Sequence, residues 1–146
     1  MVHCGPEEGK PARSYHLQRP LAKHNAWHVL TPLQELIKVR GFQVAPPELE
    51  GVLLSHPDIV DAAVIGVTDA AHEGSELPRA YIQRRPEGGE KLTTEEIQKY
   101  MRERLASYKT LTGGVVFVDA IPKNQSGKIL KRILREQAKK EMGAKL

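Results

Sequence analysis

A polar loop with two lysines, at residues 122–130, holds the side chains best suited to chemistry in this chain of 146 residues. Ser126 and Gly127 favour a tight turn there, because glycine reaches backbone angles that other residues avoid. Lys128 follows the turn, and an apolar-periodic helix is predicted to begin at once. Its long side chain can carry an ammonium to an anionic oxygen, either a phosphate or a carboxylate turning into a mixed anhydride. The alternative from this stretch alone is a surface lysine on a basic helix.

Hydrophobic patterning predicts the elements that must position this loop. Residues 36–44 should form a short two-stranded ribbon that turns at Gly41. The elements expected after it are a helix opened by Pro46-Pro47, an apolar strand at 59–67, a polar loop at 68–76, a strand at 78–84, a helix after Thr93, a strand at 115–118 and a last helix. The strand at 59–67 is apolar enough to be buried on both faces, whereas the alternating strand at 78–84 should lie nearer a sheet edge. Thr93 with Glu96 predicts a capping box.

These elements define an α+β fold: a small domain with an entrance two-stranded ribbon and a sheet of about three strands packed by helices. The length leaves room for one domain with a core. Residues 1–32 show no sustained periodicity and are expected to be a separate irregular segment, so the folded domain is assigned to residues 33–146. A hydrophobic fraction of 40% and a charged fraction of 27% are those of a soluble globular protein.

Composition and spacing argue against several functions. The single cysteine, Cys4, rules out an internal disulfide framework, and no apolar run is long enough to span a membrane. His24 and His28 have helix-face spacing but no further ligands beside them, so no metal site is predicted. A net charge of +4 and the basic last helix suggest a nucleic-acid binder as one alternative. Interleaved exposed aromatics and a recognised motif are missing, so no nucleic-acid partner is predicted.

Several segments together resemble one family. They are Glu35–Glu50, Ala62–Val67, Leu77–Ala80 and Gly113–Val118, followed by Pro122-Lys123 and Ser126–Lys128. Over roughly residues 33–142, the chain resembles the C-terminal domain of the adenylate-forming acyl- and aryl-CoA synthetases, including the 4-coumarate–CoA ligases. The resemblance implies a parent reaction in which a carboxylate, ATP and CoA give acyl-CoA, AMP and pyrophosphate, with Mg²⁺ accompanying the ATP.

The resemblance also implies residue roles. Lys128 matches the family's catalytic lysine, which stabilises the acyl carboxylate and the ATP α-phosphate during adenylation. In the family the domain then rotates, and the ribbon lines the channel where the CoA thiol attacks the acyl adenylate. Lys38 and Gln43 match positions that bind acyl-AMP or AMP. Arg40 and Gly41 match positions that bind CoA beside its pantetheine arm.

The chain departs from the family at the hinge. Thr31-Pro32-Leu33-Gln34 stands where the family has Asp-Arg-Leu-Lys, and the chain has no glycine-rich phosphate loop. We therefore expect an isolated C-terminal (lid) domain, a fragment without the N-terminal adenylation domain, inactive alone and binding no cofactor by itself. The alternative is a stand-alone binding module that docks on a separate N-terminal adenylation domain or another partner. Ligase chemistry is thus assigned to the parent enzyme, and activity of the chain itself is left open.

The last three residues, Ala144-Lys145-Leu146, are similar to the Ser-Lys-Leu signal that the peroxisomal import receptor reads. We therefore expect the chain in the peroxisome, and otherwise in the cytoplasm. The alternative is a lysine-rich helix end that happens to finish in leucine.

Overall fold

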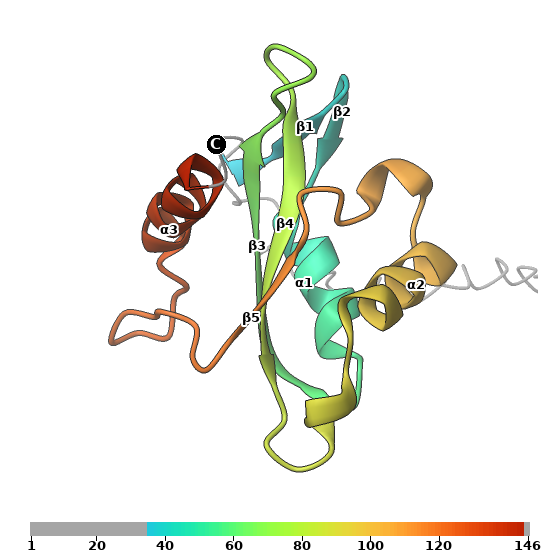
Figure 1. Cartoon of the computed structure of the whole chain (residues 1–146), viewed down its shortest axis with the longest axis vertical. Helices are drawn as coiled ribbons and strands as arrows, with labels where there is room; N and C mark the ends of the chain where they lie inside the picture. Colours follow the sequence, from blue (N-terminus) through green and yellow to red (C-terminus); the bar gives the residue numbers. More distant parts are fainter. Residues whose placement is uncertain (1–34, 145–146) are drawn as a thin grey trace, which may run out of the picture. The chain divides into compact units, whose positions relative to one another are not determined.

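A three-stranded sheet with helices on both faces forms the centre of the computed structural model, which describes residues 35–144 (Figure 1). The elements are β1 (Ile37–Val39), β2 (Phe42–Val44), α1 (Pro46–Leu54), β3 (Ile59–Thr68), β4 (Glu76–Arg84), η3 (Gly89–Lys91), α2 (Thr94–Arg104), η4 (Ser107–Lys109), β5 (Val115–Val118) and α3 (Lys131–Gly143). The predicted α+β fold, with its ribbon β1–β2, is confirmed. The predictions for residues 1–32, for the hinge and for the tail residues Lys145 and Leu146 lie outside the described residues.

The sheet has the strand order β3-β4-β5, with β3 antiparallel to β4 and β5 parallel to β4. The sequence prediction that residues 78–84 lie nearer an edge was wrong, because β4 is the central strand. Its second neighbour, β5, pairs from far along the chain, with Ala80 opposite Val115. The edge strands are instead β5 and the apolar β3. The apolar composition of β3 reflects the burial of its two faces and carries no information on whether its edge is paired.

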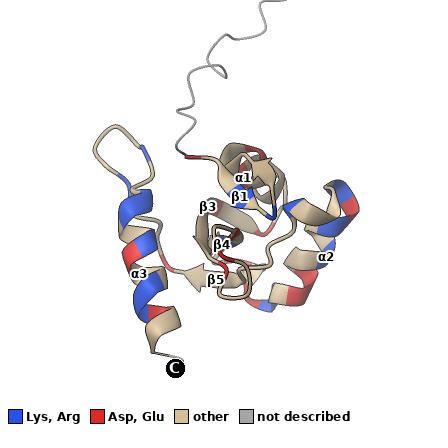
Figure 2. Ribbon diagram, turned by 90° about the horizontal axis from the view of Figure 1, so that it is seen from above, with Lys and Arg blue, Asp and Glu red and all other residues tan. Residues whose placement is uncertain are grey.

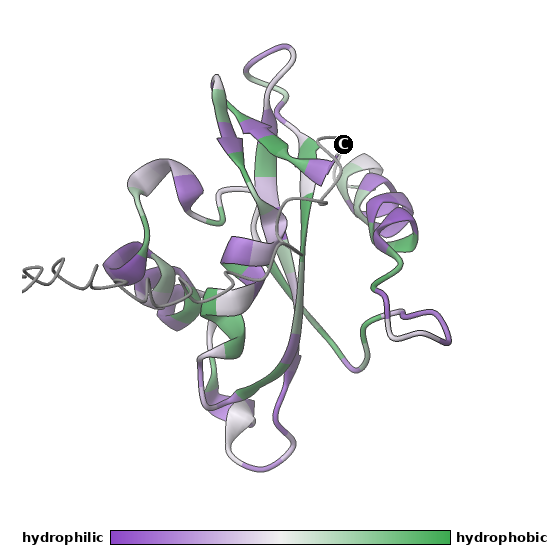
Figure 3. Cartoon of the chain, turned by 180° about the vertical axis from the view of Figure 1, so that it is seen from behind, coloured by the Kyte–Doolittle hydropathy of each residue, from purple (hydrophilic) through white to green (hydrophobic). Residues whose placement is uncertain are grey.

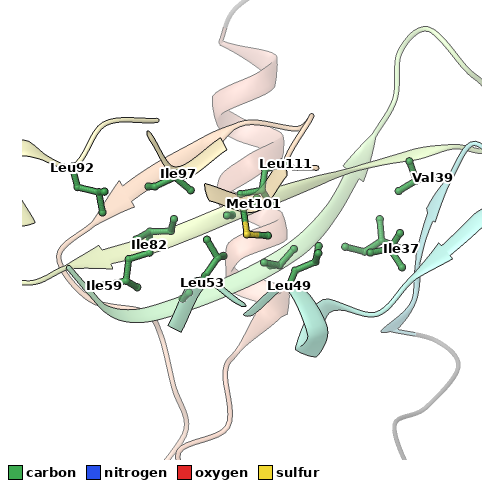
Figure 4. Packing of buried hydrophobic residues seen from close by; sticks show 14 residues of the cluster. Ile37, Val39, Leu49, Leu53, Ile59, Ile82, Leu92, Ile97, Met101 and Leu111 are labelled. Atoms are coloured by element: carbon green, nitrogen blue, oxygen red, sulfur yellow. The ribbon is translucent and has the colours of Figure 1, made fainter. Parts of the chain in front are cut away.

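The side chains of β3 belong to two separate apolar clusters, one on each face of the sheet, because successive side chains of a strand point to opposite faces. The larger cluster lies between the sheet and α1, α2 and the ribbon (Figure 4). Its strand residues include Ala62 and Val64, and Ile37 and Val39 extend it into the ribbon. The smaller cluster, beneath α3, contains Ala63, Ile65, Val67, Tyr81, Ile121, Leu134 and Ala138. Figure 3 shows the corresponding apolar colouring along β3.

The helix after Thr93 begins as predicted. The Thr93 hydroxyl accepts a hydrogen bond from the Glu96 N–H at 3.3 Å, and the Glu96 carboxylate accepts one from the Thr93 N–H at 2.9 Å. This capping box satisfies two of the N–H groups that a helix start leaves without partners. Ile97 and Met101 are the buried residues of the resulting helix α2. No helix of residues 35–144 is long and apolar enough to cross a membrane.

The carboxylate of Glu50, in the middle of α1, joins three elements of the fold. Glu50 accepts a hydrogen bond from the N–H of Val64 on the free edge of β3, at 3.0 Å. The same oxygen lies 3.2 Å from the ammonium of Lys131, the first residue of α3. Only 13% of the Glu50 side chain and 12% of the Lys131 side chain are exposed. In such a shielded setting both charges remain paired, so α1, β3 and the start of α3 are fixed relative to one another.

We expect Gly113→Ala to destabilise the domain by about 1–3 kcal/mol, since a methyl group forced into a packed site costs this much. A Cβ at Gly113 would lie 2.9 Å from the carbonyl oxygen of Pro78, and backbone cannot move aside as a flexible side chain can. The carbonyl is held there by the Gly113 N–H, at 2.8 Å. Thermal unfolding followed by circular dichroism measures the effect.

The matched control is Gly51→Ala in α1, where an added Cβ meets nothing within 4 Å. It should stabilise the domain by about 0.5–1 kcal/mol, because alanine is the better helix former. Equal shifts of the two melting temperatures would contradict the close approach at Gly113.

Candidate functional site

The ribbon places two predicted ligand-binding side chains next to each other. Its two-residue turn has both central residues at positive φ, Arg40 at 46° and Gly41 at 88°. This is the pattern of the type I′ turn that suits the twist of a hairpin. The register pairs Lys38 directly with Gln43, so both side chains lie on one face of the ribbon, and both residues are exposed. The other face is buried in the core through Ile37.

The backbone of the turn is anchored to the loop between β3 and β4. Lys38 and Gln43 form a non-hydrogen-bonded pair in a hairpin of this length, so the backbone groups of Lys38 point away from β2. The Lys38 N–H donates to the Glu76 carboxylate at 3.2 Å, and its carbonyl accepts from the Ser75 hydroxyl at 3.3 Å. The Arg40 N–H donates to the same hydroxyl at 3.0 Å. The turn is therefore held through its backbone, which leaves the side chains of Lys38 and Arg40 available for ligands.

A second support lies under the ribbon tip. The Phe42 ring stacks on the Tyr108 ring of η4, with centroids 4.4 Å apart and planes 17° apart. The adjacent Lys109 forms an ion pair with Glu48 of α1 at 2.6 Å, and this hydrogen bond is the main reason that the pKa of Lys109 is raised. These contacts tie the ribbon tip to η4, and η4 in turn to α1.

The anchoring loop has a stable internal structure. Asp69 is buried and accepts hydrogen bonds from the Ala71 N–H and from the His72 ring, both at 2.9 Å. The Ala71 N–H is the main cause of the lowered pKa of Asp69, with His72 adding to it. The Asp69 N–H bonds the Ser75 carbonyl at 3.0 Å, which holds Ser75 in place for the ribbon.

The polar loop at residues 122–130, here called the lysine loop, is held in shape mainly by one side chain, that of Asn124. The Asn124 carboxamide oxygen accepts three hydrogen bonds: from the Ser126 N–H at 3.1 Å, the Ser126 hydroxyl at 2.8 Å and the Lys128 N–H at 2.8 Å. Gly127 has φ 83°, as the predicted turn requires. The Asn124 N–H also bonds the Lys128 carbonyl at 2.9 Å. The backbone of Lys128 is thus fixed on both sides although the loop is exposed and hydrophilic (Figure 3).

The prediction that the helix begins directly after Lys128, with Ile129 and Leu130 on its apolar face, was wrong. Ile129 forms an isolated β-bridge with Lys123, and the Leu130 N–H donates to the Pro122 carbonyl at 2.9 Å, so α3 starts only at Lys131. The bridge holds these residues extended and closes the loop at its base. Lys128 therefore projects from a closed loop and not from a helix end.

The two lysines of the loop are in different environments. Lys123 forms an ion pair with Asp61 of β3. Lys128 is exposed and has no ion-pair partner within residues 35–144. Lys123 is thus structural, whereas the ammonium of Lys128 is available to an anion.

The structure brings Lys38, Gln43, Arg40 and Gly41 together on one ribbon but does not bring Lys128 to them. The ribbon lies on one side of the sheet with α1, whereas the lysine loop lies on the other side with α3 (Figure 1). Two separate faces therefore carry the predicted site residues. No group of three or more His, Cys, Asp or Glu side chains that could hold a metal occurs in the part of the chain that the structure describes.

Sequence reasoning missed the residues that hold both faces. Asn124 could have been identified, because an asparagine two residues before a Ser-Gly turn commonly accepts backbone hydrogen bonds. Ser75 and Glu76 gave no such signal, since their partners on the ribbon lie more than thirty residues away in the chain.

This arrangement of a ribbon, a three-stranded sheet and three helices matches the C-terminal domains of adenylate-forming enzymes of known structure. The sequence model of the family described as AMP-binding enzyme C-terminal domain matches residues 48–128. The chain belongs to this family.

Individual relatives agree with this assignment. An acyl-CoA synthetase from Alternaria alternata is 52% identical over 118 residues, which cover 80% of this chain and 20% of the relative. A 4-coumarate–CoA ligase-like protein from Oryza sativa subsp. japonica is 53% identical over 116 residues, covering 78% and 20%. The structure of a fatty acyl CoA synthetase from Mycobacterium tuberculosis superposes with a TM-score of 0.64 at 36% identity, covering 72% and 20%. The chain thus spans about one fifth of the length of the relatives it matches.

We expect Asn124→Ala to loosen the lysine loop without unfolding the domain, because the carboxamide oxygen is the shared acceptor of three hydrogen bonds. A net hydrogen-bond contribution of about 1 kcal/mol predicts amide exchange at Lys128 that is faster by about five- to tenfold. Hydrogen exchange followed by NMR measures this. Asn124→Asp keeps an acceptor oxygen and should preserve most of the protection, and unchanged exchange in the alanine variant would contradict the role of Asn124.

Proposed function

We propose that this chain is the lid domain of an ATP-dependent acyl- or aryl-CoA ligase. In the parent reaction the substrate carboxylate attacks the α-phosphorus of ATP and displaces pyrophosphate. The CoA thiol then attacks the acyl carbon of the adenylate, and AMP leaves with the electron pair of the broken C–O bond. The observation that carries the proposal is the ordered loop that presents Lys128, which has no ion-pair partner among residues 35–144, in a domain of this family.

Lys128 is proposed as the catalytic lysine of adenylation. Charge accumulates on the carboxylate and α-phosphate oxygens as they react, and an ammonium placed beside them offsets it. Its fixed backbone limits the conformational entropy that is lost when the side chain engages the anions. The five exposed positions 123–127 before it carry no carboxylate that would compete for the ammonium.

The ribbon is proposed as the face for thioester formation. Lys38 and Gln43, which lie side by side, would bind the acyl-AMP or AMP, and Arg40 and Gly41 would flank the CoA pantetheine. An added Cβ at Gly41 meets nothing within 4 Å in this domain, so the open space over the turn is available to a ligand. The separation of this face from Lys128 supports a mechanism in which the domain turns between the two half-reactions.

We infer that the chain alone has no turnover, since the adenylation domain would supply the ATP pocket. ATP and CoA are substrates of the parent enzyme, and Mg²⁺ would enter with the ATP. The alternative proposal is a binding module that docks on a separate N-terminal adenylation domain and works in trans. The exposed ribbon face and the lysine loop would be its contact surfaces in that case.

The C-terminal residues Ala144-Lys145-Leu146 are proposed as a signal for the peroxisomal import receptor. Helix α3 ends at Gly143, and Ala144 is exposed, which supports a tail that a receptor can read in extended form. Lys145 and Leu146 themselves lie outside the described residues.

We expect separable defects when residues 33–146 are fused to the adenylation domain of a related ligase, with the family's Asp-Arg hinge restored. Lys128→Ala should slow ATP–pyrophosphate exchange by about 100-fold or more, as the loss of one preorganised charge commonly does. Thioester formation from supplied acyl-AMP should remain within a few-fold. Gly41→Trp should give the reverse pattern, because it crowds only the CoA face.

Two matched changes control for structural damage. Lys123→Ala removes a charge from the same loop but one already paired with Asp61, and it should affect exchange far less than Lys128→Ala. Gly41→Ala introduces the backbone strain of φ 88° without the bulk. The chain without the fusion should release no pyrophosphate. If Lys128→Ala and Gly41→Trp impair the same half-reaction equally, the assignment to two faces is wrong.

A fluorescent protein fused in front of residues 33–146 should form puncta that coincide with a peroxisomal marker. The import receptor binds the free terminal carboxylate, so deletion of Leu146 should return the fluorescence to the cytosol. Fluorescence microscopy of living cells measures both, and a diffuse signal from the intact fusion would refute the proposal.

A further inference from the structure

The free edge of β3 is capped along one half and open along the other. In an antiparallel pair, residues alternate between hydrogen-bonded and outward-pointing backbone groups. The outward N–H of Ala62 donates to the Asp61 carboxylate at 3.0 Å, and that of Val64 donates to Glu50 at 3.0 Å. Because the alternation has a period of two, Gly66 and Thr68 must also point their N–H groups outward.

Two independent observations support this alternation. Gly66 lies opposite Pro78, which has no N–H and so cannot belong to a pair that exchanges two hydrogen bonds. The Asp69 N–H donates to the Ser75 carbonyl at 3.0 Å, which makes the next pair along, Thr68 with Glu76, an outward one. Within residues 35–144 no side chain or loop caps the N–H of Gly66 or Thr68.

These two residues line a groove of about 390 Å³ between β3 and α3. Its apolar surface comes from Val67, Ala138 and Met142, and 37% of Met142 is exposed. A strand edge with open backbone donors and acceptors beside an apolar surface is a template for another strand.

The charges along the groove determine which kind of strand could bind there. Arg135 and Lys139, one helical turn apart on α3, are exposed and line it. Figure 2 shows that Lys and Arg residues recur along this helix. The one carboxylate in the lining, Glu76, is already bonded to the Lys38 N–H. The two cations therefore favour an acidic side chain in whatever strand binds.

We propose that the groove binds an extended, acidic segment of a partner protein by strand addition to β3. The segment's backbone would pair with Gly66 and Thr68. Its apolar side chains would contact Met142, and an acidic side chain would meet Arg135 and Lys139. A second copy of this chain fits less well, because two β3 edges would bring four such cations together.

The groove meets the ribbon only through Glu76, which accepts a hydrogen bond from the Lys38 backbone N–H, and none of the proposed site residues lines it. It lies along the C-terminal part of α3, whereas the Lys128 loop precedes the N-terminal end of this helix of 13 residues. A bound segment would thus leave Lys128 and the ribbon side chains accessible. This places the proposed surface outside the proposed ligase chemistry, and the two can fail separately.

The test uses the ¹⁵N-labelled full chain and the capped pentapeptide Val-Thr-Glu-Thr-Val as the probe, because its first, third and fifth side chains share one face and can all meet α3. Titration followed by NMR should shift the amide signals of Gly66 and Thr68 and slow their hydrogen exchange. Arg135→Glu with Lys139→Glu should weaken binding about tenfold, or ~1.4 kcal/mol. The control pair Arg132→Glu with Lys140→Glu makes the same charge change on the same helix outside the groove and should change the affinity less than about twofold.

Two further peptides separate strand addition from simple charge attraction. A lysine-containing peptide of the same pattern should not bind, and an N-methylated glutamate peptide, which keeps its charge but cannot pair, should also fail. Binding of the N-methylated peptide, or equal loss in both double variants, would overturn the proposal. So would an absence of shifts at Gly66 and Thr68, or shifts that depend on protein concentration alone, which would indicate self-association.

Discussion

The carboxylate of Glu50 is the contact on which the arrangement of both proposed faces depends. It receives the edge N–H of β3 and the ammonium of Lys131 at the same oxygen, in a setting largely shielded from water. Removing one partner of a mostly buried ion pair typically costs about 3–5 kcal/mol, because the other charge is left uncompensated. Since α1 follows the ribbon directly and α3 follows the lysine loop directly, this one group joins the segments that carry the two sets of site residues.

Local sequence signals predicted local structure well. The capping box at Thr93, the turn at Gly41 and the apolar strand around Val64 are each specified by residues within a few positions of one another, and each is present. The prediction that β4 lies near an edge failed because the position of β4 depends on its pairing with β5, which follows α2 in the chain. Local sequence patterns do not report such a distant pairing. The error at Lys128 arose because a bridge from Lys123 overrides the helical periodicity that starts at Ile129.

The site residues were found by resemblance, and the structure adds how they are held. Lys38 and Gln43 could be placed on a ribbon from the turn signal alone, but their attachment to Ser75 and Glu76 could not, since nothing in the sequence marks these partners. Both faces share one design. Backbone groups are fixed by a neighbouring polar side chain, and the charged side chains of the same residues point outward. The backbone of each site residue is therefore held rigidly, while its side chain stays available to a ligand.

The parallel pairing of β4 with β5 has a consequence for how the domain folds. The β3–β4 hairpin joins neighbours in sequence, whereas the pairing of Ala80 with Val115 closes a long stretch of chain that contains α2. Closing so long a loop is entropically costly, and non-local pairings of this kind slow folding. The lysine loop lies between β5 and α3, the last two elements of the domain. During synthesis, the segment proposed for catalysis is therefore among the last to acquire its structure, after the ribbon has left the ribosome.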